Sequence, residues 1–139
     1  MILFVDDDDK RMESIIDELS LSGLDVRFYS DVDEAVTFFE THSEEVKLLI
    51  LDIMMPHGSN FNAEETELGL RTGVRFFKKI REARYDLPVI IFTNVSDQDV
   101  SERFGKENRC AFLQKRDFLP FEFAEEVRRV LASNRTLFG

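Results

Sequence analysis

Leu48–Leu51 is a run of four apolar residues that leads directly into Asp52, and Pro56 stiffens the loop that follows. A short, unbroken run of Leu and Ile is typical of a β-strand that is covered on both faces, as in a parallel sheet between two helix layers. The carboxyl ends of parallel strands line the crevice in which ligands bind. We therefore expect Asp52 to lie at the mouth of a functional site.

The size and charge of the chain limit its architecture and its partners. With 139 residues and a mass of 16.2 kDa, it is expected to form one domain over residues 1–139. Its formal net charge of −10 predicts repulsion from nucleic-acid phosphates and anionic lipid, so we expect neither direct nucleic-acid binding nor a membrane partner. The single cysteine, Cys110, excludes an internal disulfide and is typical of the reducing cytoplasm.

Apolar segments with strand-like and helix-like spacing alternate along the chain, which predicts an α/β fold with a parallel sheet wrapped on both faces. Ser30 is expected to cap the second helix, and Gly23 to end the first in a left-handed conformation. The predicted strands are Ile2–Val5, Leu24–Tyr29, Val46–Leu51, Val89–Phe92 and Ala111–Leu113. The predicted helices carry apolar faces within Met12–Leu19, Val32–Phe39, Val74–Ile80, Ser96–Phe104 and Phe121–Leu131.

Polar side chains that suit phosphoryl chemistry follow four of these strands. The first strand leads into Asp6 and Asp7, the third into Asp52, the fourth into Thr93 and the fifth into Lys115. Three crowded carboxylates repel one another, and a hard divalent cation such as Mg²⁺ would relieve that repulsion. An Asp carboxylate can attack phosphorus to form an acyl phosphate, while a cation, a hydroxyl and an ammonium group stabilise the transferring group.

These segments resemble the receiver domain of bacterial two-component response regulators. The matching segments are Ile2–Asp8, Leu51–Pro56, Thr72-Gly73 at the start of a helix, Pro88–Thr93 and Phe112–Lys115. The resemblance implies a flavodoxin-like, doubly wound sheet of five parallel strands in the order 2-1-3-4-5, with five helices and, in this chain, a long loop after the third strand. It also implies a signalling domain that assists its own phosphorylation and dephosphorylation rather than an enzyme.

The resemblance assigns a role to each residue of the set. Asp52 would accept a phosphoryl group from a histidine kinase or a phosphotransfer protein, and Thr93 and Lys115 would hold the phosphoryl oxygens. The implied Mg²⁺ ligands are Asp52, Asp7, Asp6 through water, and the backbone carbonyl of Met54.

The implied switch residues are Thr93 and Phe112, although packing in the core would explain Phe112 nearly as well. The surface that changes would be the fourth helix, fifth strand and fifth helix, roughly Ser96–Leu131. A downstream protein partner or a second copy in a homodimer would bind there.

Three features depart from the family pattern. Arg116 stands where Pro normally follows the lysine, and Asn94 replaces a residue that is usually small. The segment 57–72 is longer than the usual connection and exceeds ordinary loop lengths, so it is a candidate lid or partner-recognition element.

Two alternatives remain from the sequence. An aspartyl-phosphate phosphatase of the haloacid dehalogenase type also uses an Asp after an apolar strand, but it requires a second Asp at the position of Met54. A degenerate receiver that acts as a phosphorylation-independent binding scaffold would be consistent with Arg116, Asn94 and the long loop. The complete set of five strand-end residues favours the phosphorylated receiver over both.

Overall fold

The computed structural model describes the backbone of residues 1–138 and the side chains of residues 1–133. Its strands are β1 (Ile2–Val5), β2 (Val26–Tyr29), β3 (Leu48–Leu51), β4 (Val89–Thr93) and β5 (Cys110–Gln114). Its α-helices are α1 (Asp9–Leu21), α2 (Val32–His42), α3 (Thr72–Ala83), α4 (Gln98–Gly105) and α5 (Pro120–Phe138). Two 3₁₀ turns, η1 (Ser43–Glu45) and η2 (Lys115–Asp117), lie before β3 and after β5.

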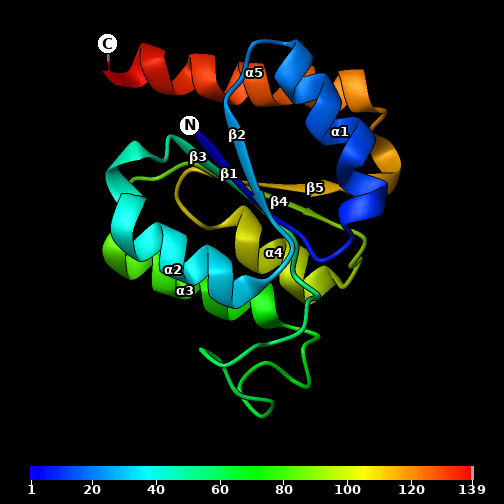
Figure 1. The fold of residues 1–139 in the computed structure, drawn as a ribbon, viewed down its shortest axis with the longest axis vertical. Coiled ribbons are helices and arrows are strands. Elements are labelled where there is room, and N and C mark those ends of the chain that lie inside the picture. The colour runs from blue at the N-terminus through cyan, green and yellow to red at the C-terminus, as the bar shows by residue number, and fades with distance from the viewer. Residues whose placement is uncertain (139) are drawn as a thin grey trace.

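The five strands form one parallel sheet in the order β2-β1-β3-β4-β5, which confirms the predicted fold. Helices α1 and α5 cover one face of the sheet, and α2, α3 and α4 cover the other (Figure 1). Each face therefore has its own apolar core, and the central strands β1, β3 and β4 are buried along their whole length.

The register of the sheet determines which residues meet at its carboxyl edge. Val5 of β1 pairs with Leu51 of β3, so the residues that follow them, Asp6 and Asp52, leave the sheet side by side. Thr93 of β4 pairs with Gln114 of β5 and ends its strand beside the start of η2. The sheet thus brings the predicted strand-end residues to one edge.

Several predicted boundaries were wrong, for physical reasons. Asp31, not Ser30, caps α2, because its carboxylate accepts the N–H groups of Asp33 (2.8 Å) and Glu34 (3.3 Å). Strands β2 and β3 begin two residues later than predicted, because the ladder with β1 starts only at Ile2. Strand β5 is longer than Ala111–Leu113, because its pairing with β4 continues at both ends. The irregular segment ends at Arg71, because Thr72 already belongs to α3.

The turn after α1 agrees with the prediction for Gly23, which adopts φ +84° just beyond the helix.

Among the described residues, no helix combines the length and the apolar character needed to cross a lipid bilayer.

Candidate phosphorylation site

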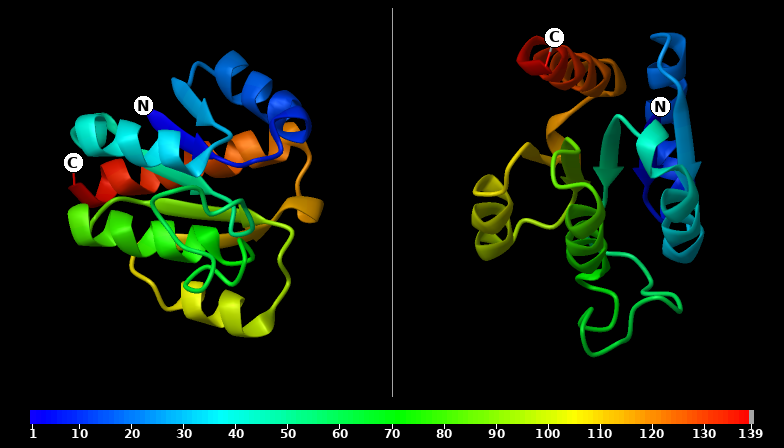
Figure 2. Two further views of the ribbon diagram at one scale, coloured as in Figure 1. Left: turned by 60° about the horizontal axis from the view of Figure 1, so that its bottom comes forward. Right: turned by 90° about the vertical axis from the view of Figure 1, so that its left-hand side faces the viewer.

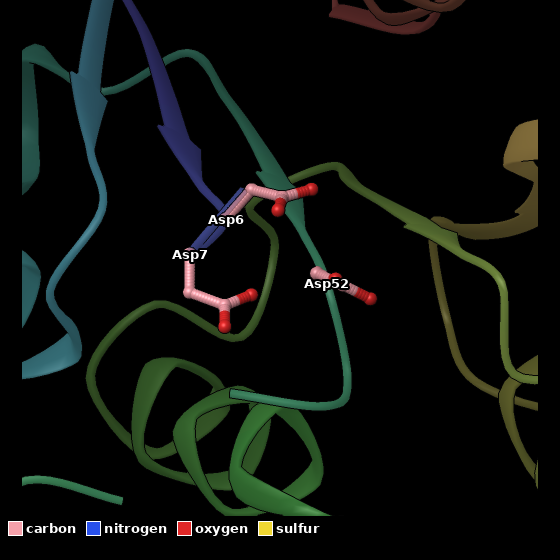
Figure 3. A group of neighbouring side chains, drawn as sticks. All are labelled: Asp6, Asp7 and Asp52. Atoms are coloured by element: carbon pink, nitrogen blue, oxygen red, sulfur yellow. The ribbon is translucent and has the colours of Figure 1, made fainter. Parts of the chain in front are cut away.

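Three carboxylates meet at the carboxyl edge of the sheet (Figure 3). Asp6 and Asp7 directly follow β1 and Asp52 directly follows β3, and one oxygen of each lies within 4.8 Å of the others. Asp6 is fully buried and Asp52 is 6 % exposed, whereas Asp7 faces solvent. The backbone fixes this arrangement, since Asp52 N–H donates to the Val5 carbonyl (3.1 Å).

Lys115 supplies the positive charge of the cluster. Its Nζ lies 2.7 Å from Asp6 Oδ2 and 3.0 Å from Asp52 Oδ2, and its side chain is only 11 % exposed. Burial alone would lower the pKa of Lys115, but the charges of Asp52 and Asp6 outweigh it, and the pKa is raised. Lys115 therefore stays protonated between the two carboxylates.

The pKa values of Asp6 and Asp7 are also raised, which for a carboxyl group favours the neutral form. Burial, followed by the charge of Asp52, raises the pKa of Asp6 to about 6, although Lys115 acts against the shift. Partial loss of hydration beside the cluster, followed by the charge of Asp52, also raises the pKa of Asp7. Protonation of Asp6 and Asp7 is favoured because their carboxylates lose hydration and lie beside the negative charge of Asp52.

The donor set fits a hard divalent cation. All three side chains offer oxygen, and the buried Asp6 Oδ2 accepts no hydrogen bond although it is paired in charge with Lys115. The other oxygens of Asp6 and Asp52 accept the N–H groups of Asp8 (2.9 Å) and Ile53 (2.8 Å), which orients both carboxylates. Oxygen ligands and an uncompensated negative charge are what Mg²⁺ prefers, so this Asp cluster could hold a metal ion.

An open pocket of about 1020 Å³ leads to the cluster. Its lining includes five predicted positions, which are Asp7, Asp52, Met54, Thr93 and Lys115, and also Asn94. Arg116 lies exposed in η2 and is not among the lining residues.

The two predicted switch residues lie on neighbouring strands of the sheet but have different surroundings. Thr93 is fully buried at the pocket, and its Oγ1 accepts the N–H of Val95 (3.2 Å). Phe112 lies half-buried on β5, and its ring stacks on Phe104 of α4 with centroids 6.2 Å apart. Phe112 thus contacts α4 rather than the pocket.

The segment between β3 and α3 forms one wall of the pocket and extends beyond the sheet as a loop (Figure 2). It is anchored to α2, because the Asp33 carboxylate accepts the N–H groups of Ser59 (2.7 Å) and Asn60 (2.9 Å). These hydrogen bonds hold the pKa of Asp33 below its usual range. The segment is therefore hydrogen-bonded into the fold at its tip.

The same segment brings apolar side chains to the pocket. Glu67, Leu68 and Gly69 all have positive φ (52°, 60° and 93°), and this left-handed turn leaves Leu68 83 % exposed at the pocket. A side chain at Gly69 would approach the Met55 carbonyl to 2.8 Å, so the turn requires glycine there. Sequence reasoning missed Leu68, because no periodic pattern covers residues 57–71.

Two other residues near the site had no signal in the sequence that singled them out. Arg11 lines the pocket from the first turns of α1, where a charged residue usually indicates only a solvated face. Gln114 precedes Lys115, and its Nε2 donates to the Val95 carbonyl (2.8 Å). Only the three-dimensional path of the loop after β4 reveals this contact.

Comparison with known proteins agrees with this fold. The chain belongs to the response regulator receiver domain family, whose family model matches residues 2–125. It is 27 % identical over 130 residues to the alkaline phosphatase synthesis transcriptional regulatory protein PhoP of Bacillus subtilis, covering 94 % of this chain and 48 % of PhoP. The chain thus spans about half the length of this curated relative.

Solved receiver domains share the fold. A CheY-like receiver domain protein from Methanospirillum hungatei superimposes with a TM-score of 0.76 at 20 % identity, covering 97 % of this chain and 95 % of that one. The receiver domain of Francisella response regulator 1452 gives a TM-score of 0.74 at 22 % identity, covering 96 % and 97 %. The chain is therefore a receiver domain of the two-component type, a signalling domain rather than a classical enzyme.

Proposed function

We propose that this receiver accepts a phosphoryl group on Asp52 from a histidine kinase or a phosphotransfer protein, in a reaction that requires Mg²⁺. The observation that carries the proposal is the convergence of Asp6, Asp7, Asp52 and Lys115, of which Asp7, Asp52 and Lys115 line a pocket that is open to solvent. Phosphate incorporation from the small-molecule donor acetyl phosphate, blocked by EDTA, tests it.

Asp52 is the nucleophile of this proposal. A carboxylate oxygen forms a bond to phosphorus while the bond from phosphorus to the donor's imidazole nitrogen breaks, and that nitrogen keeps the electron pair. The Ile53 N–H and Lys115 orient the carboxylate before the reaction. Lys115 and the Thr93 hydroxyl then stabilise the phosphoryl oxygens.

Asp6, Asp7, Asp52 and the Met54 carbonyl would hold Mg²⁺, with Asp6 acting through water. The ion would supply positive charge to the phosphoryl oxygens during transfer. The chain's own contribution is to keep the carboxylates oriented and deprotonated above the raised pKa of Asp6.

The proposed output is the α4–β5–α5 surface, where a downstream protein or a second copy would bind. Support comes from Phe112, which connects β5 to α4 through its contact with Phe104. The net charge of −10 argues against nucleic acid or a membrane as a direct partner of this chain, and the single cysteine fits the cytoplasm. The alternative of a phosphorylation-independent scaffold gains no support from the family comparisons.

Magnesium is expected to stabilise the fold more at about pH 8 than at about pH 5, because protonated Asp6 ligates poorly. Without Mg²⁺, the stability of the fold is expected to decrease, not increase, as the pH rises. The folded-state pKa of Asp6 exceeds its unfolded value, so the folded state binds the extra proton, and raising the pH from about 4 to about 6 removes up to about 3 kcal/mol of stability.

Thermal unfolding with MgCl₂ or EDTA at both pH values measures this effect. Asp7→Asn should abolish the Mg²⁺-dependent rise in Tm, whereas Asp25→Asn, which removes an exposed carboxylate before β2, should retain it. An equal Mg²⁺-dependent rise in the two variants would contradict the assigned metal site.

The acyl phosphate is expected to be long-lived, because Met54 and Val95 line the pocket beside Asp52 and hinder an attacking water. Met54→Gln keeps the side-chain length but adds polarity, and should shorten the half-life roughly 2- to 10-fold. Leu21→Gln, at an exposed position on α1, is the matched control. A half-life of seconds in the unmodified chain, unchanged in Met54→Gln, would show that Met54 gives no protection.

A further inference from the structure

The loop after β4 is held at Val95 by two side chains from neighbouring strands. The Val95 N–H donates to Thr93 Oγ1 (3.2 Å), and the Val95 carbonyl accepts from Gln114 Nε2 (2.8 Å). Thr93 and Gln114 are direct partners in the ladder between β4 and β5. Val95 is thus hydrogen-bonded to the ends of both β4 and β5.

The Gln114 amide has an unused acceptor. Its Oε1 is buried and receives no hydrogen bond, although Nε2 of the same amide is satisfied by Val95. The Val95 carbonyl fixes the amide orientation, because only the NH₂ end can donate to it. A buried acceptor without a partner is destabilising, so a nearby N–H that became free would form a hydrogen bond there.

A side-chain amide can serve both backbone groups of one extended residue. Its N–H and its oxygen lie on one edge, and the C=O and N–H of an extended residue also point to the same side. Gln114 makes one such hydrogen bond, to the Val95 carbonyl, while Thr93 Oγ1 accepts the Val95 N–H. Thr93 is thus the acceptor of this N–H in the structure, and Gln114 Oε1 is a free acceptor on an amide that already binds the same residue.

This competition matters for the proposed phosphorylation. If the Thr93 hydroxyl turns away from the Val95 N–H towards a phosphoryl group on Asp52, the N–H is left unpaired beside a buried threonine, and this cost opposes the movement. A second acceptor at the same N–H removes this cost.

We propose that Gln114 is a positioning residue of the switch, which accepts the Val95 N–H when Thr93 turns towards the phosphoryl group. Val95 then remains attached to β5 through both of its backbone groups while Thr93 moves. The movement of Thr93 rests on the proposed function, whereas the alternative acceptor at Gln114 does not.

Amide hydrogen exchange at Val95, measured by NMR, tests the alternative acceptor without phosphorylation. In Thr93→Val, Gln114 should take the N–H and keep its protection within about threefold of the wild type, and Gln114→Met should do the same through Thr93. Thr93→Val combined with Gln114→Met should lose about tenfold or more. The Ile50 amide in the central strand β3 reports whether each variant is folded.

Two results would overturn the proposal. If Thr93→Val alone exposes Val95 as much as the double variant, Gln114 never accepts this N–H. If the double variant keeps full protection, neither side chain holds it.

A second arm adds acetyl phosphate with Mg²⁺. The Val95 amide should stay protected in the phosphorylated wild type. In phosphorylated Gln114→Met it should exchange about tenfold faster. Equal protection in the two phosphorylated proteins would contradict the exchange of acceptors during the switch. Intact mass shows separately whether either protein was phosphorylated, so failure of the proposed function is distinguished from failure of this inference.

Discussion

Gly73→Ala is expected to lower the free energy of unfolding by about 3 kcal/mol or more, a large effect for the addition of one methyl group. A Cβ at Gly73 would lie 2.1 Å from the Asp52 carbonyl oxygen and 2.6 Å from Ile53 Cα. Both are backbone atoms, which cannot rotate away as a side chain can. The Gly73 N–H also donates to the Ile53 carbonyl (2.8 Å), so α3 begins directly against the segment that carries Asp52.

Urea unfolding of Gly73→Ala beside Gly105→Ala measures the effect. Gly105 lies in α4, and a Cβ there meets nothing within 4 Å, so its replacement should be neutral or stabilise by up to about 1 kcal/mol. Similar midpoints for the two variants would show that α3 does not pack this closely on Asp52. The folded fraction of the Gly73→Ala protein should also accept phosphate more slowly, because the added Cβ forces the backbone of Asp52 to shift.

Lys115→Met is expected to change phosphorylation and metal binding in opposite directions. The ammonium lies 2.7 Å from Asp6 and 3.0 Å from Asp52, and in the proposed reaction it stabilises the phosphoryl oxygens. Its loss should slow labelling by acetyl phosphate roughly 10- to 100-fold. Removing a cation from beside three carboxylates should at the same time tighten Mg²⁺ binding.

Labelling rates and Mg²⁺ titration of Lys115→Met test this split, with Lys106→Met, at an exposed position after α4, as the control. A variant that only unfolds the site would lose both properties together. Labelling at the rate of the wild type would mean that Lys115 has no role in the transfer. Weaker Mg²⁺ binding in a folded variant would contradict the electrostatic account.

The fold was largely predictable because its signals are local. Buried parallel strands are short apolar runs and their covering helices are amphipathic, so Leu48–Leu51 and the spacing within α1 indicated their structures directly. The exact ends of the strands were harder to predict, since the start of β3 depends on where its neighbour β1 begins. The cap of α2 was misplaced by one residue because Ser30 and Asp31 are both good capping residues.

Most of the candidate site was also predictable, since the carboxyl ends of parallel strands meet. Asp6, Asp52 and Lys115 follow their strands, and the structure brings all three into contact. The rest depends on loop geometry, which has no periodic pattern. Leu68 reaches the pocket only through a left-handed turn, and Gln114 contacts Val95 only because of the path taken after β4.

Intact mass after incubation with acetyl phosphate and Mg²⁺, for the wild type and Asp52→Ala, tests the central claim most directly. Asp52 and Asp6 both follow a central strand and contact Lys115, but of these two only Asp52 lines the open pocket. We predict that the wild type gains one phosphoryl group, and that Asp52→Ala or EDTA abolishes the gain. An equal gain in Asp52→Ala, or none in a folded wild type that binds Mg²⁺ even with a cognate kinase, would contradict the assignment of Asp52 as phosphoacceptor.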